Sequence, residues 1–96
     1  MDKKLKLEIL KKDLQMTSTN ANDSYLEKLL ELGEAAVVRE GIAIKEDSIE
    51  INMAAIHYAA YLYRKRAGKE TAMPRYLRYE LNNILFSQKG KAEKKE

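Results

Sequence analysis

Apolar side chains recur along this chain at intervals of three and four residues, which is the spacing of one face of an α-helix. The pattern predicts four helices and no competing strand, over residues 3–15, 24–40, 48–67 and 74–88. A polar stretch at residues 17–22 has the composition of a loop. We therefore expect an all-α fold in one small domain, residues 1–88, followed by a charged, disordered tail at residues 89–96.

The third helical segment differs from the others because it carries apolar residues on two opposed sides. At about 100° per residue, one side holds Ile49, Met53, Ile56, Ala60, Tyr63 and Ala67. The nearly opposite side holds Ile51, Ala55, Tyr58 and Leu62. A surface helix has one apolar stripe, whereas two opposed stripes indicate packing on both sides. The sequence therefore predicts that this helix lies at the centre of the domain.

The other three segments each show a single stripe of core residues. The stripes consist of Leu7, Leu10 and Leu14, then Leu26, Leu29, Leu30, Gly33 and Val37, and finally Leu77, Leu81, Ile84 and Leu85. Residues 24–27 have the S-x-x-E form of a capping box, and Asp47 or Ser48 can cap the third helix. Gly41 fits the residue that follows a helix, and Pro74 fits the first position of one.

Composition fits one globular domain and excludes several kinds of chemistry. The chain has 96 residues, of which 45% are hydrophobic, and it contains no cysteine. Disulfides, thiolate metal sites and cysteine nucleophiles are therefore excluded. The N-terminus lacks the apolar core of a signal peptide, and the longest apolar stretch, residues 49–63, is interrupted by polar side chains. We expect a protein that functions, or is assembled, in a cytoplasm and makes no membrane contact.

Catalysis is not favoured by the pattern of titratable residues. His57 shares a helical side with Glu50 and Arg64, but at spacings of seven residues. Such groups lie roughly 10 Å apart along a helix and cannot hydrogen-bond in sequence. No phosphate-binding glycine loop, metalloprotease motif or hydrolase motif occurs, and one histidine is not a metal-ligand set. We expect no catalytic residue, metal or cofactor, and we interpret His57 as structural or exposed.

The charge is distributed unevenly. Residues 23–50 hold eight acidic and three basic residues, whereas residues 64–78 hold six basic residues and one acidic residue. Tyrosines are interleaved with these bases, a combination that can hold phosphates and stack bases in nucleic-acid binding. The alternative is that the bases lie on solvated helix faces, while the tyrosines belong to the core or to an interface. A helix-turn-helix needs a tight turn, and the joint at residues 68–73 is looser. Sequence-specific DNA recognition is therefore not favoured.

The order of these segments resembles a known family. The first feature is an acidic amphipathic helix at residues 22–36, which a glycine-ended loop follows. An alanine-rich helix comes next at residues 53–66 and ends in an aromatic-x-x-Arg pattern. Pro74 then opens the last helix. In these features, over roughly residues 5–87, the chain resembles the head–tail connector proteins (adaptor or head-completion proteins) of tailed bacteriophages, which are often described as DNA-packaging proteins. Residues 85–87 depart from the Pro-Tyr-Arg-like segment that the family often has at this end.

The resemblance implies a structural role in the virion, after assembly in the bacterial host cytoplasm. It implies a homo-oligomeric ring of about a dozen subunits, set between the portal protein and a tail-side completion protein, through which double-stranded DNA passes without sequence recognition. Two alternatives remain open from the residues themselves. The chain fits a small helical DNA-binding or regulatory protein, and it also fits a helical subunit of a heteromeric complex.

Two sets of residues are candidates for contacts in a ring. A head-to-tail contact would join an acidic stripe to a basic cluster of the next subunit, through Glu27, Glu31, Glu34, Arg64, Arg66, Arg75 and Arg78. The portal would dock on the outward side of the last helix and on the basic tail, through Tyr79, Phe86, Lys89 and Lys91.

Overall fold

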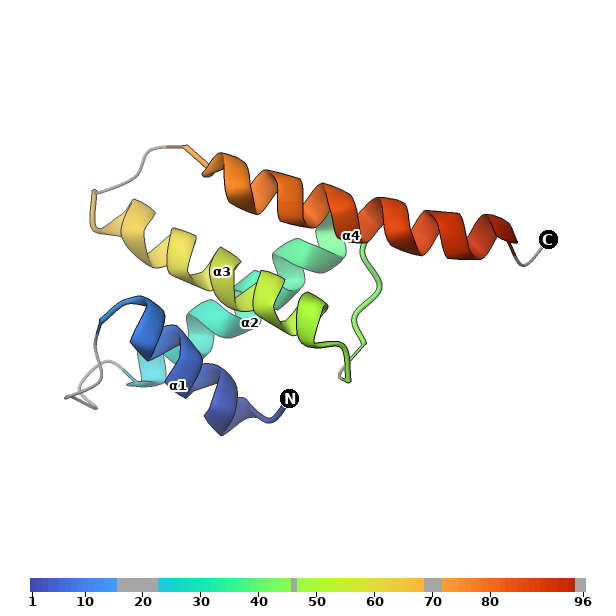
Figure 1. Cartoon of the computed structure of the whole chain (residues 1–96). Helices are drawn as coiled ribbons and strands as arrows, with labels where there is room; N and C mark the ends of the chain where they lie inside the picture. The colour runs from blue at the N-terminus through green and yellow to red at the C-terminus, as the bar shows by residue number, and fades with distance from the viewer. Residues whose placement is uncertain (16–22, 46, 69–71, 95–96) are drawn as a thin grey trace.

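The computed structural model describes residues 1–15, 23–45, 47–68 and 72–94 (Figure 1). Within these ranges the chain forms four α-helices and no strand: α1 (Lys3–Asp13), α2 (Asp23–Arg39), α3 (Ile49–Arg66) and α4 (Arg75–Lys94). None of these helices is long and apolar enough to cross a membrane. The predicted all-α fold of four helices is confirmed.

The third helix, α3, separates two clusters of buried side chains. The first cluster joins α3 to α1 and α2 and consists of Leu10, Leu26, Leu29, Leu30, Ile56, Ala59 and Ala60. The second joins α3 to α4 and to the end of α2, and consists of Val37, Ile42, Ile51, Ala54, Ala55, Tyr61, Leu77, Leu81 and Ile84. The predicted packing on both sides of this helix is confirmed. In Figure 1, α4 runs antiparallel to α3 along its outer side.

Two residues of the predicted core, Ile49 and Ala67 at the two ends of α3, are exposed. Ile49 was expected on the same side as Ile56, yet 72% of its surface is accessible. Ile49 is the first residue of α3 and lies outside the buried stretch of this helix, which begins at Ile51. A hydrophobic pattern read along a whole helix does not show where the neighbouring helices stop covering it.

The helices α2 and α3 lie in close contact at Gly33, which is buried. A Cβ atom at this position would lie 2.5 Å from the carbonyl oxygen of Ala55 and 3.2 Å from the amide nitrogen of Ala59. The backbone of α3 therefore fills the space that a side chain would need. The two helices can pack at this distance because glycine on one faces alanines on the other.

The end of α2 confirms the predicted role of Gly41. Gly41 adopts a φ of 99°, in the left-handed region that glycine tolerates, and its N–H donates to the Val38 carbonyl at 2.9 Å. The next amide, that of Ile42, donates to the Val37 carbonyl at 3.3 Å. These two bonds form a Schellman motif. The side chains of Val37 and Ile42, before and after the turn, are buried in the second cluster.

The helix starts agree only in part with the prediction. The Ser48 hydroxyl caps α3 by accepting from the Ile51 N–H at 3.3 Å, as predicted. The predicted capping box at Ser24 is wrong, because α2 already begins at Asp23 and places Ser24 inside the first turn. The acidic Asp23 favours this earlier start, and its carboxylate lies 3.0 Å from the Lys11 ammonium group of α1.

The fourth helix is longer than predicted. It begins beside Pro74, whose carbonyl accepts from the Arg78 N–H at 3.2 Å, and it continues to Lys94 rather than ending at residue 88. The helix thus includes the backbone of residues 89–94, while residues 95–96 lie outside the described ranges; the expected disorder of the tail stays a prediction. Lysine, alanine and glutamate follow Gly90, and they are strong helix formers that offset its cost of about 1 kcal/mol.

The Gln88 side chain connects α4 by hydrogen bonds to the loop between α2 and α3. The Gln88 Oε1 accepts from the Ala43 N–H, and the Gln88 Nε2 donates to the Ala43 carbonyl, both at 2.9 Å. The amide thus satisfies both backbone groups of a loop residue, in the way that a neighbouring strand would. In Figure 1 the end of α4 beyond this loop extends past the other helices.

We predict that Gly33→Ala destabilises the fold. The new Cβ would overlap the α3 backbone, and such overpacking costs about 1–3 kcal/mol, which outweighs the gain of up to about 1 kcal/mol in helix propensity. Thermal unfolding followed by circular dichroism should show a lower Tm. The exposed Ala35 on the same helix provides a calibration, because Ala35→Gly changes propensity without touching α3. An unchanged or raised Tm for Gly33→Ala would contradict the close contact.

Candidate functional site

The single histidine takes part in an interhelical contact rather than in the row with Glu50 and Arg64. His57 Nδ1 lies 2.9 Å from Glu80 Oε1 on α4, and its ring meets the Tyr76 ring edge to face, with centroids 6.1 Å apart. Arg64 instead bonds the side chain and the carbonyl of Asp13. The prediction that the row does not act as one hydrogen-bonded set therefore agrees with the geometry.

The contact with Glu80 changes the titration of His57. The hydrogen bond to the Glu80 carboxylate raises the pKa of His57 above its ordinary value, and partial burial opposes this rise. The negative charges of Glu80 and Asp13 also raise the pKa, whereas the positive charge of Arg64 lowers it. The pair thus links α3 to α4 most strongly when the histidine is protonated. In the described part of the chain, no three histidine, aspartate or glutamate side chains gather closely enough to hold a metal ion.

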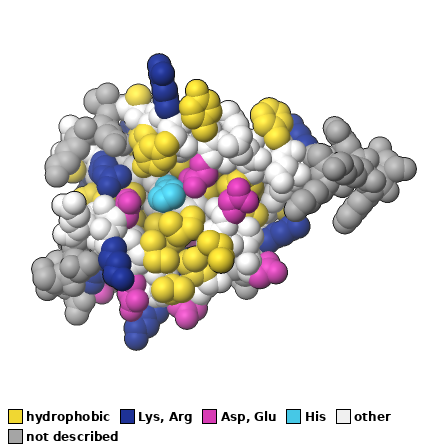
Figure 2. All heavy atoms as spheres, in the orientation of Figure 1, with side chains coloured by type: hydrophobic (Ala, Val, Ile, Leu, Met, Phe, Trp, Pro, Cys, Tyr) yellow, Lys and Arg dark blue, Asp and Glu magenta, His cyan; other side chains and the backbone are white. Residues whose placement is uncertain are grey.

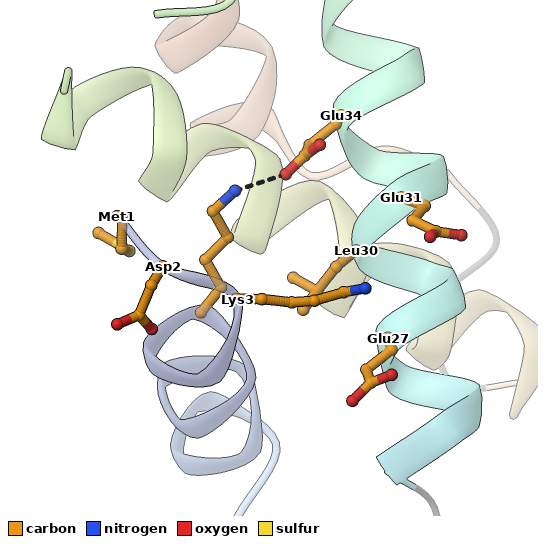
Figure 3. A pocket seen from close by; sticks show the side chains of 8 residues that line it. Met1, Asp2, Lys3, Glu27, Leu30, Glu31 and Glu34 are labelled. Carbon is orange, nitrogen blue, oxygen red and sulfur yellow. Dashed lines mark hydrogen bonds and ion pairs between the residues drawn. The ribbon is translucent and has the colours of Figure 1, made fainter. Parts of the chain in front are cut away.

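The acidic stripe of α2 faces α1 within the same chain. Glu27, Glu31 and Glu34 line an open groove of about 430 Å³ between the two helices, together with Lys3 and Lys6 (Figure 3). The Lys6 ammonium lies 2.7 Å from Glu34, and Figure 3 shows Lys3 extending across the groove toward the α2 carboxylates. Glu34 therefore has a cation of its own chain as partner. Glu31 is the exposed acid of the groove, and Glu27 is half-buried.

Of the arginines in the predicted subunit contact, some have partners within the same chain, as Glu34 does. Arg78 binds Glu40 at 2.7 Å, and Arg64 binds Asp13 at 3.3 Å. The guanidinium of Arg66 lies over the Tyr25 ring, 5.1 Å from its centroid. Arg75 is exposed at the start of α4. The structure thus does not bring the acidic stripe and the basic cluster together within one chain, and it gives several of their members local partners.

Aromatic side chains on α4 face solvent, in the positions predicted for docking. Tyr79 and Phe86 are 65% and 68% exposed, and Lys89 is exposed beyond them. Tyr76, which the sequence analysis did not include in this set, joins them because spacings of three and seven residues keep one helix face. We call Tyr76, Tyr79 and Phe86 the α4 patch. The side chain of Lys91 lies outside the described residues.

A second exposed apolar surface, on α2, was missed by the sequence analysis. It consists of Leu32, Ala35 and Val38, which we call the α2 patch, and the two larger residues are more than half exposed. The signal was present, because these residues follow one another at intervals of three on the side away from Leu26 and Leu30. Figure 2 shows that apolar side chains also gather on both sides of the histidine on the face drawn.

No protein-family model, curated protein or solved structure matches this chain. The resemblance to phage head–tail connector proteins therefore remains an interpretation of the sequence. The described surface carries two apolar patches, an acidic groove and several exposed or half-buried arginines.

We predict that the contact between His57 and Glu80 makes stability depend on pH. The pKa of His57 is raised in the folded state, so the contact contributes fully below the unfolded pKa of about 6.5. Its contribution falls as the pH rises through the folded pKa. Glu80→Gln should therefore cost about 1 kcal/mol near pH 5.5 and less near pH 8.5.

Urea unfolding at the two pH values measures this difference. Glu50→Gln serves as a matched control, because Glu50 is an exposed carboxylate on α3. Equal losses of stability for Glu80→Gln at both pH values would show that protonation of His57 does not strengthen the contact.

Proposed function

We propose that this chain is a structural subunit that binds copies of itself head to tail and closes into a ring, as in phage head–tail connectors. One observation carries the proposal: the chain exposes two separate apolar patches, the α2 patch and the α4 patch. Single exposed apolar residues are ordinary on protein surfaces. Aligned groups of them on two different helices are more typical of surfaces that a partner covers.

Two different patches on one chain favour a head-to-tail contact. In such a contact, one surface of a subunit meets a different surface of the next, and the repeated rotation either closes a ring or grows a filament. A single self-complementary patch would favour a two-fold dimer instead. The helices α2 and α4 pack against α3 mainly through different clusters, so their outward faces point in different directions.

Electrostatic pairs have a smaller part in this contact than the sequence suggested. Glu34, Arg64 and Arg78 already bind partners within the chain. Glu31 forms an exposed pair with Lys28 of its own helix, at 3.5 Å. We assign Glu27, Glu31 and Arg75 to contacts between subunits, where exposed pairs contribute only about 0–1 kcal/mol each. We therefore assign the free energy of association to the apolar patches, and we assign the orientation of the subunits to the charges.

The portal-docking part of the proposal uses the far end of α4. This end extends beyond the other helices in Figure 1, and its exposed side carries Phe86 followed by the basic Lys89. An apolar ring with a cation beside it suits a groove with an acidic rim on a neighbouring protein. Duplex DNA would pass through the ring without sequence recognition, since a passage that reads bases would hinder sliding.

We predict that two sets of substitutions each prevent self-association. The first, Tyr79→Ala with Phe86→Ala, removes the two most exposed rings of the α4 patch, and the second, Leu32→Ser with Val38→Ser, removes the two larger side chains of the α2 patch. Both should fold, because these side chains are largely exposed. Light scattering and negative-stain imaging should show rings for the wild-type chain, with or without a portal protein, and monomers for each variant alone.

Mixing the two variants distinguishes a head-to-tail contact from a two-fold contact. Each pair of unlike chains retains one intact α2 patch and one intact α4 patch, so the mixture should form dimers that cannot grow. Dimers of the second variant alone would instead indicate that the α4 patch binds itself. A wild-type chain that stays monomeric under all conditions, portal included, would exclude the ring and favour a heteromeric complex or a regulatory role.

A further inference from the structure

The last turn of α3 carries three successive cations that the fold holds in different ways. Arg64 binds Asp13. The Lys65 ammonium lies 5.9 Å from the centre of the Tyr61 ring, and the guanidinium of Arg66 lies 5.1 Å from the centre of the Tyr25 ring. Of these three, Arg64 is neutralised by a carboxylate. Lys65 and Arg66 keep their charge and are positioned by aromatic rings.

Arg66 lies at the edge of a groove that α2 and α3 form together. The groove has a volume of about 300 Å³ and is lined by Tyr25, Tyr63, Arg66 and Ala67. The rings of Tyr25 and Tyr63 are tilted by 52°, with centroids 6.4 Å apart. Among the described residues, no carboxylate forms an ion pair with Arg66.

These contacts favour an anionic ligand with several oxygen atoms. A guanidinium presents its donors in a planar fork that matches a phosphate group, and tyrosine hydroxyls also donate to phosphate oxygens. Stacking on Tyr25 restricts the side chain of Arg66 before any ligand arrives, which lowers the entropy lost on binding. The guanidinium covers one face of the Tyr25 ring, so a nucleobase cannot stack there.

Charge outside the groove extends the same surface. Tyr63 also lines a second groove, of about 240 Å³, together with Arg64 and its ion-pair partner Asp13, so the charge of Arg64 is balanced there. Lys65 is exposed between the two arginines in sequence. A ligand that continues beyond one phosphate, such as a polymeric phosphodiester, would therefore meet Lys65 as a further cation, whereas a free phosphate ion would meet Arg66 alone among the cations.

We propose that Arg66, with Tyr25 and Tyr63, binds the phosphodiester backbone of nucleic acid. The inference deepens the proposed function, on which it rests for its biological setting, because it names where a connector subunit would contact the DNA. It also moves Arg66 from the predicted subunit contact to the DNA contact. Binding by the free chain does not require a ring, so imaging and binding experiments test the two proposals separately.

The test is fluorescence anisotropy with a short labelled duplex, at salt concentrations from about 50 to 200 mM. A phosphate contact contributes about 0.9 to the slope of log affinity against log salt on duplex DNA. Arg66→Ala should weaken binding several-fold at low salt and reduce this slope by about one. Arg39→Ala is the matched control, because it removes the same charge from an exposed position at the far end of α2; it should leave the slope nearly unchanged.

A second variant separates a positioned site from charge alone. Tyr25→Leu keeps the charge of Arg66 but removes the ring beneath it, so binding should weaken although the net charge is unchanged. Circular dichroism checks that each variant keeps its helices. A single strand of the same sequence forms the second arm, and the proposal expects both forms to bind.

Three outcomes would overturn the proposal. Equal losses for Arg66→Ala and Arg39→Ala would indicate diffuse attraction by net charge. Binding of the single strand alone would indicate base stacking rather than contact with the backbone. Absence of binding at low salt would exclude the site altogether.

Discussion

The close approach of α2 and α3 at Gly33 is the contact on which the rest of the fold depends. It is possible only because glycine meets the backbone of α3 beside alanines, at distances that leave no room for a Cβ atom. With α2 fixed in this way, α1 packs over both helices and completes the first cluster. The opposite side of α3 then remains open for α4, and the end of α2 closes the second cluster through Val37 and Ile42.

This arrangement separates the parts of the molecule that have different tasks. The α4 helix is held by Leu77, Leu81 and Ile84, and its outward aromatic rings add little to this packing. The α2 helix uses its inner face for the core and carries the α2 patch among charged residues on its outer face. Contact surfaces can therefore change without loss of the fold, because the residues that build the core lie on the opposite sides of the same helices.

Much of the fold could be predicted from the sequence, because helical periodicity and end signals act locally. The two-sided packing of α3, the stop at Gly41 and the exposure of Tyr79 and Phe86 all follow from residue spacing. The end of α4 could not be predicted as well, since one glycine among strong helix formers does not decide whether a helix stops.

The periodicity of hydrophobic residues could not predict contacts between residues that lie far apart in the sequence. The pairs His57 with Glu80 and Tyr25 with Arg66 depend on how far each helix is rotated and shifted against its neighbour. Periodicity gives the face of a helix but not the residue opposite. The acidic stripe shows the same limit, because the lysines of α1 that meet it were visible in the sequence only as part of a basic end.

The bond between Gln88 and Ala43 has a mechanical consequence. The α4 helix extends beyond the body of the molecule, so a load applied at its tip would act on a lever arm (Figure 1). The two hydrogen bonds at Ala43 place a fulcrum near the base of that arm, on the loop that connects α2 to α3. Tilting of α4 would therefore pull on the loop and, through it, on both helices that surround Gly33.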